Sequence, residues 1–284
     1  MSFPADAVLW QEQVESPSLG DPARPLGDDG RVDVLVVGGG YAGLAAAIEV
    51  ARAGRRVLVV EKGEIGWGAH RRNGGMAIPE LKAGPATLEA RYGELGRRMH
   101  AEVNEAFDHL EARIADEAID CDYRRSGQLY LAHAARVVPH LQHLALEHAE
   151  AGEPVRFVAR EELGAEIGSE AFHGGVVFER TGGLQPAKLH DGLLRAALAA
   201  GASVRDRCAA RAIDDSTAPS GRFRVETDAG PVVADHVIVA TNAYADRLLP
   251  ELQRRVLPIG SFIVATEPLD PEVAAAVSRG AGCS

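Results

Sequence analysis

The chain has 284 residues, of which 46% are hydrophobic and 25% charged, and its formal net charge at pH 7 is −11. This length predicts about two domains or one large one, and the composition is typical of a soluble globular protein with a sizeable core. The acidic balance argues against a general nucleic-acid-binding protein, because such a protein usually presents a basic face.

Cysteine usage and hydropathy bear on the compartment. Cys121, Cys208 and Cys283 lie far apart and form no Cys-x-x-Cys pair. A disulfide framework or a zinc site is therefore not expected, and a reduced compartment, the cytoplasm, fits best. No signal peptide is visible at the N-terminus. The longest uncharged run, residues 34–48, is too short and too rich in glycine for a membrane span.

The N-terminal part of the chain contains a β-α-β pattern. Residues 1–30 are rich in Pro, Asp and Glu and predict an irregular leader, which Trp10 either anchors to the body or leaves exposed. Apolar runs at 32–37 and 56–61 then predict buried strands. The small-residue pattern between them predicts a helix over 43–54 that ends at Gly54. Such a unit should cross over right-handed.

Beyond residue 61 the predicted elements are more mixed. A long or broken amphipathic helix is predicted over 86–118, a strand over 128–133, a helix over 134–151, a strand over 174–180 and a helix over 186–201. Short strands are predicted at 202–207, 209–213, 222–227, 231–234, 235–241 and 261–268. The elements therefore predict an α/β fold, in which an antiparallel (α+β) region is inserted into a Rossmann-type domain.

A glycine motif follows the first predicted strand. Gly38, Gly40 and Gly43 form G-x-G-x-x-G between a strand and a helix, and Glu61 closes the next strand. In this setting Gly38 permits a tight turn, Gly40 lets the backbone approach a pyrophosphate, and Gly43 lets helix and strand pack closely. The helix N-terminus attracts the pyrophosphate, and Glu61 can accept hydrogen bonds from a ribose hydroxyl. The motif predicts an ADP-containing dinucleotide but does not distinguish NAD from FAD.

Two further stretches favour FAD. Residues 65–75, IGWGAHRRNGG, combine glycines and basic side chains directly after the second strand. Such a loop can wrap backbone amides around a pyrophosphate and the inner edge of a flavin ring. The second stretch is the predicted strand that ends in Ala240-Thr241-Asn242 and can return to the nucleotide. An NAD(P)-dependent dehydrogenase, the alternative that shares the first β-α-β unit, leaves both stretches unexplained.

At this point a family resemblance is clear. The stretches DVLVVGGGYAGLAAAIEVARAGRRVLVVEKGEIGWGAHRRNGG, CDYRRSGQLYLA, GGLQPAKLHDGL and VIVATNAYADRLLPEL are similar to the FAD-dependent oxidoreductases of the D-amino-acid oxidase superfamily. Within it they resemble the γ-glutamylputrescine oxidoreductase-like (OrdL-type) amine oxidases. The resemblance implies a discontinuous FAD-binding domain over 31–120 and 181–250. Residues 121–180 and 251–284 would then form a partial substrate domain.

The resemblance also implies where FAD lies. Its ribose would lie by Glu61, its pyrophosphate over residues 38–43, its adenine near Ala210, and its flavin against residues 72–76, where Arg72 and Asn73 would act electrostatically. The residues expected to bind FAD are Gly38, Gly40, Tyr41, Ala42, Gly43, Glu61, Lys62, Gly68, Ala69, Arg72, Asn73, Gly74, Gly75, Met76, Ala210, Ala240, Thr241 and Asn242.

Two departures from the family pattern stand out. The family reads A-S-G-R-N-G-G where this chain has AHRRNGG, so that His70 replaces a small hydroxyl side chain and Arg71 replaces a glycine. These cations either pair with the pyrophosphate or, through their bulk, distort the loop. The chain also ends before further substrate-domain strands and a final flavin-contacting segment of the family pattern.

Other clusters favour structural interpretations. His140, His143 and His148 share a helical stretch, which we interpret as a solvated face rather than a metal site, so that no metal is expected. His190 and Asp191 are predicted on a helix surface. Tyr123 and Tyr130 are either sheet residues, the favoured interpretation, or part of a substrate pocket. Tyr244, which follows the Ala-Thr-Asn turn, is either a cofactor contact or a structural residue.

The predicted function is FAD-dependent oxidation of an amine or amino-acid-like C–N bond by hydride transfer to flavin, with oxygen or another molecule accepting the electrons. A small-molecule amine, γ-glutamylputrescine by resemblance, is the expected substrate, and no catalytic acid or base is named. The alternative is a truncated relative that binds FAD weakly or not at all and is catalytically inactive. Neither nucleic acid nor a membrane is an expected partner.

Overall fold

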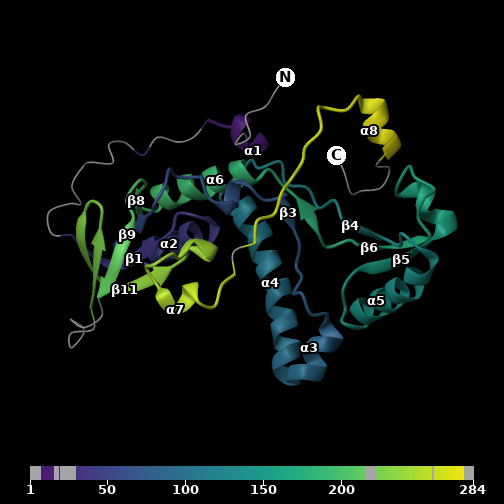
Figure 1. The fold of residues 1–284 in the computed structure, drawn as a ribbon, viewed down its shortest axis with the longest axis horizontal. Coiled ribbons are helices and arrows are strands. Elements are labelled where there is room, and N and C mark those ends of the chain that lie inside the picture. The colour runs from purple at the N-terminus through teal and green to yellow at the C-terminus, as the bar shows by residue number, and fades with distance from the viewer. Residues whose placement is uncertain (1–7, 16–18, 20–29, 215–221, 258, 278–284) are drawn as a thin grey trace. The chain divides into compact units, whose positions relative to one another are not determined.

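A computed structural model describes residues 8–15, 19, 30–214, 222–257 and 259–277. The chain forms two compact units (Figure 1). The first unit contains residues 1–74, 117–121 and 186–263, and the second contains 75–116, 122–185 and 264–284. The predicted division is also discontinuous, but it assigns residues 75–116 to the nucleotide-binding region, whereas these residues cluster with the second unit.

A six-stranded sheet forms the centre of the first unit. Its order is β8-β2-β1-β11-β10-β9. The first four of these strands run parallel, β10 runs antiparallel to β11, and β9 runs antiparallel to β10. The strands are β1 (Arg31–Val37), β2 (Val57–Val60), β8 (Ser203–Arg205), β9 (Ala210–Asp214), β10 (Phe223–Thr227) and β11 (Gly230–Val239).

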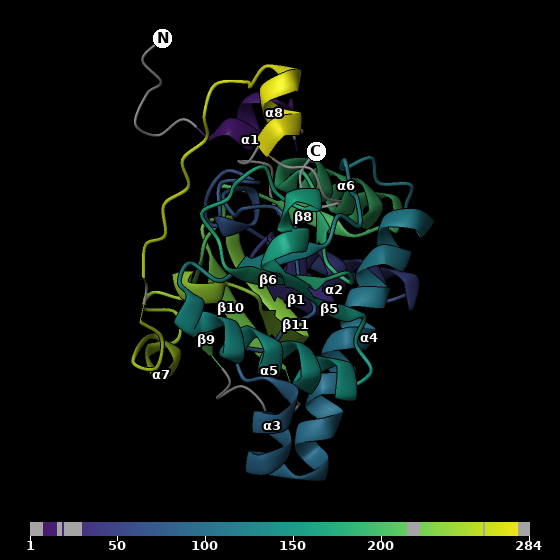
Figure 2. The same cartoon turned by 90° about the vertical axis from the view of Figure 1, so that its right-hand side faces the viewer.

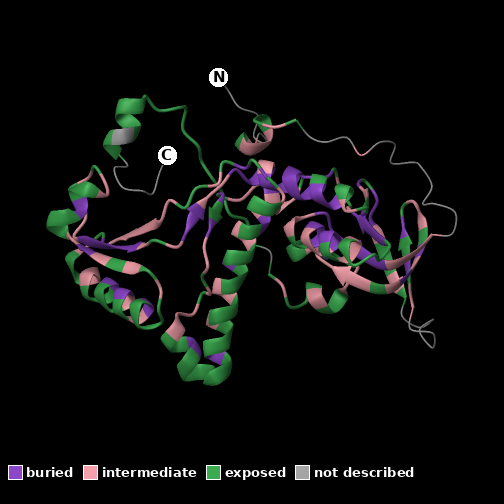
Figure 3. Cartoon of the chain, turned by 180° about the vertical axis from the view of Figure 1, so that it is seen from behind, coloured by how far each residue is buried: buried purple, intermediate pink, exposed green. Residues whose placement is uncertain are grey.

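The helices of the first unit follow from the sequence pattern. They are α1 (Leu9–Glu12), α2 (Tyr41–Arg52), α6 (Pro186–Ala199) and α7 (Pro250–Gln253), with short 3₁₀ turns η1 (Ala69–Arg71) and η5 (Asn242–Tyr244). The β-branched residues of β1 and β2 are buried because helices cover the parallel part of the sheet. Helix α6 packs on α2 and is buried over most of its length, as the purple bands of Figure 3 show.

The second unit has a three-stranded antiparallel sheet of order β4-β6-β5. Helix α5 lies along this sheet (Figure 2). It packs on the sheet through an apolar cluster that includes Leu141, Ala145 and Val176. The elements are β3 (Met76–Ala77), α3 (Pro85–Tyr92), α4 (Glu94–Asp116), β4 (Gln128–Leu131), η2 (Ala135–Val137), α5 (Val138–Glu150), β5 (Val155–Ala159), η3 (Arg160–Ala165), β6 (Gly174–Phe178), β7 (Gly182–Gly183) and α8 (Pro271–Val277).

Most predicted elements are present, and the α/β prediction is confirmed. The predicted helix over 86–118 is broken at Gly93, whose φ of 58° ends α3. Most of the predicted leader lies outside the described residues. The part that is described includes helix α1, where the Trp10 indole Nε1 donates to the Asn73 carbonyl at 2.9 Å. This bond ties the helix to the body of the unit.

Two strand predictions are wrong. The sequence predicts separate strands at 231–234 and 235–241, but β11 runs unbroken through Asp235, whose carboxylate accepts a hydrogen bond from Arg222 Nε at 3.1 Å. The predicted strand at 261–268 is absent. Phe262 is 93% exposed and Val264 91% exposed, and no described strand pairs with this segment. An apolar pattern without a pairing strand does not make a sheet.

Candidate cofactor site

The candidate site lies at the carboxyl ends of β1 and β11. From β1 the chain crosses over to β2 on one side, whereas β11 pairs with β1 on the other side. The strand order therefore reverses between β1 and β11. In open parallel sheets ligands bind in the crevice outside the carboxyl ends at such a point. The turn that begins at Gly38 and the turn of residues 240–242 meet there.

The glycine turn is shaped by close backbone contacts. Gly38 has a φ of 109°, and a Cβ there would lie 2.6 Å from the Ala240 carbonyl oxygen. A Cβ on Gly43 would lie 2.0 Å from the Gly38 carbonyl oxygen. The first contact brings β1 and β11 together, and the second lets α2 approach the turn. Both positions therefore exclude a side chain, as the motif predicts.

A cleft of about 1580 Å³ opens at this crevice within the first unit. It is larger than the ~300–1,000 Å³ of an ordinary small-molecule pocket, and so has room for an extended dinucleotide. Thirteen of the predicted residues line it: Gly38, Gly40, Tyr41, Ala42, Glu61, Lys62, Gly68, Ala69, Asn73, Ala210, Ala240, Thr241 and Asn242. The cleft is also lined by His70 and Tyr244, whose roles the sequence leaves open, and by four side chains that no sequence motif indicates: Trp67, Arg207, Arg211 and Arg247.

The remaining predicted residues have other positions. Gly43 is buried in α2, where it permits close packing. The Arg72 guanidinium stacks over the Trp67 ring at 4.9 Å, and its Nε donates to the Trp67 carbonyl at 2.7 Å. Gly74 is exposed at the end of the first unit. Gly75 and Met76 belong to the second unit, where the Gly75 carbonyl accepts from Leu184 N and Met76 pairs with Gly183.

The walls of the cleft present polar groups that suit a dinucleotide. Helix α2 begins with Gly40 as its N-cap and no side chain caps it, so its first amides face the cleft without a side-chain acceptor. Glu61 accepts hydrogen bonds from the Gly39 amide at 2.8 Å and the Gly63 amide at 3.1 Å, and a carboxylate has further lone pairs for ribose hydroxyls. Thr241 Oγ1 is buried without a hydrogen-bond partner. These groups fit an ADP moiety.

The loop of residues 65–75 reaches the cleft through residues 67–70 and Asn73, whereas Ile65 and Arg71 are buried in the unit. The glycines leave room for side chains: a Cβ on Gly66 would lie 2.5 Å from Arg71 Nε, and one on Gly68 would lie 2.9 Å from His70 Cε1. Arg71 is buried, with 1% of its surface exposed, and pairs with Asp191. It is not a cation presented to a pyrophosphate. Asn73 Nδ2 donates to the carbonyls of Ala69 and His70 at 3.2 and 3.1 Å and so stabilises η1.

The surface prediction for His190 and Asp191 is wrong. Both are buried in α6, and His190 has no exposed surface. His190 Nδ1 accepts from Arg71 Nε at 3.2 Å, and its Nε2 lies 2.8 Å from the Gly39 carbonyl oxygen. The His70 ring stacks on the His190 ring with centroids 4.2 Å apart. The error arose because α6 is covered by α2 and η1, whereas a helix with polar residues is usually exposed on one side.

Burial sets the ionisation of this region. It lowers the pKa of His70 to about 4, helped by the positive charges of Arg71 and Arg72. Burial also lowers the pKa of His190 to about 3, with a contribution from His70. Both imidazoles are therefore neutral at pH 7, so His70 lines the cleft without a positive charge that could pair with the pyrophosphate, the first of the two alternatives for this residue. Burial raises the pKa of Tyr41 to about 12, and its hydroxyl donates to the Pro186 carbonyl at 2.9 Å.

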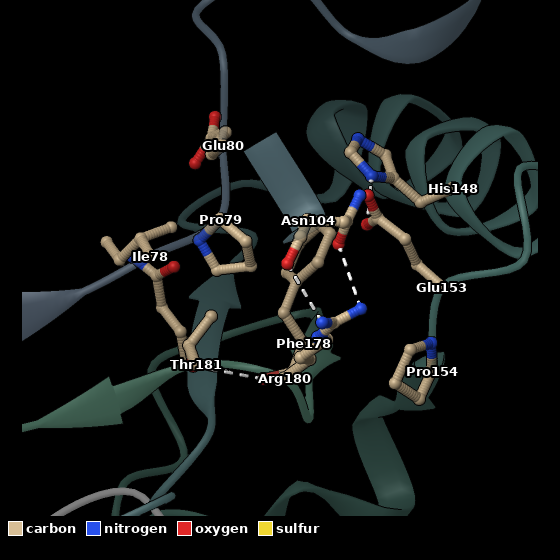
Figure 4. Close-up of a pocket in the computed structure, with 11 residues that line it drawn as sticks. Ile78, Pro79, Glu80, Asn104, His148, Glu153, Pro154, Phe178, Arg180 and Thr181 are labelled. Atoms are coloured by element: carbon tan, nitrogen blue, oxygen red, sulfur yellow. Dashed lines mark hydrogen bonds and ion pairs between the residues drawn. The ribbon is translucent and has the colours of Figure 1, made fainter. Parts of the chain in front are cut away.

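A second, much smaller cavity of about 20 Å³ lies within the second unit. Figure 4 shows the side chains around it, with His148 directed at Glu153 and Arg180 at Asn104. His148 Nδ1 lies 2.6 Å from a Glu153 oxygen, and His100 Nε2 lies 3.1 Å from the other. His140 and His143 are exposed, but His148 is buried, so the predicted solvated face is wrong for His148. The cavity is just large enough for a water molecule.

Two other expectations concern aromatic side chains and the membrane. The Tyr123 hydroxyl donates to Glu111, and Tyr130 lies on β4 with its ring edge against Phe178 at 5.5 Å. Both therefore make structural contacts in the second unit. Among the described residues, none of the helices combines the length and apolar character that crossing a bilayer requires.

Comparison with known families agrees with this geometry. The family model described as FAD dependent oxidoreductase (DAO) matches residues 33–282. The chain belongs to this family. FAD is the family's cofactor, and the residues of the cleft fit it. The chain is 33% identical over 263 residues to the probable oxidoreductase OrdL of Haemophilus influenzae, and 32% identical over 256 residues to the γ-glutamylputrescine oxidoreductase of Escherichia coli. Each alignment covers 89% of this chain.

The chain spans 59% of the length of each of these two relatives. Among solved structures, glycine oxidase from Geobacillus kaustophilus superposes with a TM-score of 0.63 at 27% identity, covering 77% of this chain and 57% of that one. L-proline dehydrogenase from P. horikoshii also superposes with a TM-score of 0.63, covering 77% of this chain and 55% of that one. At 18% identity this similarity shows a shared fold. The resemblance inferred from the motifs is thereby confirmed.

Proposed function

We propose that the cleft of the first unit binds FAD and that the protein oxidises a C–N bond of an amine or amino-acid-like substrate. The observation that carries the proposal is the crevice between β1 and β11, where the glycine turn, the start of α2 and the unpartnered Thr241 hydroxyl converge. When bound, FAD would supply a hydride acceptor for the carbon beside the amine.

The residues of this chain would bind and orient the cofactor. The first amides of α2 and the close turn at Gly38 would hold the pyrophosphate, because a helix N-terminus favours negative charge. Glu61 would accept hydrogen bonds from the ribose hydroxyls, and the backbone at Ala210 would contact the adenine. The assignment of the flavin ring to residues 72–76 is a prediction from the family pattern. The first unit is then the FAD-binding unit and the second belongs to the substrate region.

The proposed substrate class follows from the relatives. One of them is named γ-glutamylputrescine oxidoreductase and a solved neighbour is named glycine oxidase, so both primary amines and amino acids are candidates. We propose a γ-glutamylputrescine-type amine, because the higher identity is to the former group. Oxygen or another acceptor would take the electrons. The buried Cys121 and Cys208 suit a reducing compartment, so a cytoplasmic location is part of the proposal.

The test is an absorption spectrum of the purified chain after addition of FAD and removal of the excess, followed by anaerobic addition of amines. The proposal expects flavin bands at close to one FAD per chain, and bleaching on addition of γ-glutamylputrescine or a related amine. Bound flavin that no amine or amino acid bleaches would support a catalytically inactive relative. A folded protein that retains no flavin would contradict the proposal altogether.

A further inference from the structure

His190 is buried in the first unit with both ring nitrogens engaged. Arg71 Nε can only donate, so the His190 Nδ1 at 3.2 Å must accept. The Gly39 carbonyl oxygen can only accept, so the His190 Nε2 at 2.8 Å must donate. These two contacts define one state of the ring, the neutral imidazole with its proton on Nε2. The depressed pKa of His190 agrees with that state.

The carbonyl that His190 reaches belongs to the glycine turn. Gly39 lies between Gly38 and Gly40, the first two glycines of the motif. Its amide donates to Glu61 at 2.8 Å while its carbonyl accepts from His190. The two bonds come from opposite parts of the unit, one from the end of β2 and one from α6. Together they fix the orientation of the peptide groups on both sides of Gly39.

Arg71 and Asp191 hold His190 in this position. The Arg71 guanidinium is paired with Asp191, which keeps two buried charges balanced beside the imidazole. Gly66 leaves the space that the guanidinium fills. On its other side, the His190 ring stacks on the His70 ring. His70 in turn lies against Gly40, where an added Cβ would be 3.1 Å from His70 Nδ1. The cluster therefore contacts the turn at both Gly39 and Gly40.

We propose that His190, held by Arg71 and Asp191, is a positioning residue that keeps the glycine turn in the conformation that binds the FAD pyrophosphate. This inference rests on the proposed function, because it assigns the turn to FAD. His190 does not line the cleft, and it acts through the Gly39 carbonyl. Arg71 then belongs to this supporting cluster and acts through His190, whereas His70 both stacks on His190 and lines the cleft.

The test compares His190→Phe with His190→Gln. Phenylalanine keeps a ring against His70 but removes the donor, whereas glutamine retains an N–H that can reach the Gly39 carbonyl. We expect His190→Phe to raise the Kd for FAD, measured by flavin fluorescence, at least about tenfold, which corresponds to the loss of one buried hydrogen bond. His190→Gln is expected to bind within about threefold of the unaltered protein. His140→Gln, on an exposed site of α5, is the matched control.

Hydrogen exchange provides a readout that needs no cofactor. In the apoprotein, His190→Phe should speed exchange of the amides of residues 38–41 while those of 34–37 in β1 stay protected. An equal loss of protection across the whole unit would mean that His190 has only a general structural role and would overturn the proposal. Equal FAD affinity in His190→Phe and the unaltered protein would overturn it as well.

A third measurement covers the case in which His190→Phe does not fold. Long-range ¹H–¹⁵N correlation spectra of the unaltered protein should show His190 neutral and protonated at Nε2. A cationic ring, or a proton on Nδ1, would contradict the assigned contacts and overturn the proposal. If the unaltered protein takes up no FAD, the proposed function fails and this inference fails with it. If it binds FAD and only the His190 results disagree, this inference fails alone.

Discussion

Acidification is expected to destabilise the first unit through His190. The ordinary histidine pKa of 6.5 falls to about 3 in the fold because the ring is buried and lies beside His70 and Arg71. Between these two values the unfolded chain binds a proton that the folded chain does not. Stability therefore falls as the pH decreases from 6.5 towards 3 and is unaffected by this group above 6.5. Linkage with these values gives a loss of about 2 kcal/mol between pH 7 and pH 5.

The measurement is urea unfolding at pH 7 and pH 5, for the unaltered protein and for His190→Gln. Both tryptophans of the chain, Trp10 and Trp67, lie in the first unit, so tryptophan fluorescence reports on that unit. Glutamine can donate to Gly39 but does not titrate. Its variant should therefore lose about 2 kcal/mol less on acidification than the unaltered protein does. The His190→Gln variant would still lose stability on acidification, because burial also lowers the pKa of His70, to about 4.

His140→Gln removes an exposed histidine of α5 and should lose the same free energy of unfolding on acidification as the unaltered protein. If His190→Gln also loses the same amount, His190 is protonated in the folded state at pH 5, and the account of the buried cluster is wrong.

Three other contacts lead to predictions of their own. Gly38→Ala should raise the Kd for FAD at least about tenfold in a fluorescence titration, because residue 38 has a φ of 109° and an added Cβ would lie 2.6 Å from the Ala240 carbonyl oxygen. An unchanged affinity would refute the role of this turn. Arg71→Met should cost about 3–5 kcal/mol in urea unfolding, since it removes the ion-pair partner of a buried carboxylate, whereas Arg211→Met in an exposed pair should leave the free energy of unfolding nearly unchanged. Similar costs for the two would show that the buried pair is not special. The pKa of His148 is raised by its hydrogen-bonded partner Glu153, so His148 should stabilise the second unit below pH 6.5 and lose this effect as the pH rises through its folded pKa. Unfolding of that unit would be followed with a fluorine-labelled phenylalanine. A difference in free energy of unfolding between His148→Gln and the unaltered protein that does not change with pH would refute the prediction.

The sequence predicted the nucleotide-binding half of the fold because its signals are local. The strands β1 and β2 are continuous β-branched runs, and the helix between them has small residues and a glycine end. The role of Gly38 follows from the motif and from the positive φ that only glycine adopts easily. Such features need no knowledge of distant contacts, and the structure has them where the pattern placed them.

The buried cluster could not be predicted in the same way. Arg71 and His190 are 119 positions apart, and nothing near either residue indicates the other. A basic residue in a glycine loop suggests a phosphate, and a His-Asp pair on a helix suggests solvent. The clue was the combination: the unusual arginine in the loop needs an acid if it is buried, and α6 carries Asp191. The strand predicted at 261–268 failed for the related reason that a strand also needs a partner.

The most direct test of the central claim is a titration of the purified chain with FAD, followed by flavin fluorescence, with ADP added as a competitor. We expect saturable binding of one FAD per chain, displaced by ADP, because the glycine turn, Glu61 and the start of α2 are the groups proposed to bind the ADP half of FAD. Binding that ADP does not displace, or no binding by the folded chain, would contradict the assignment of this cleft to FAD.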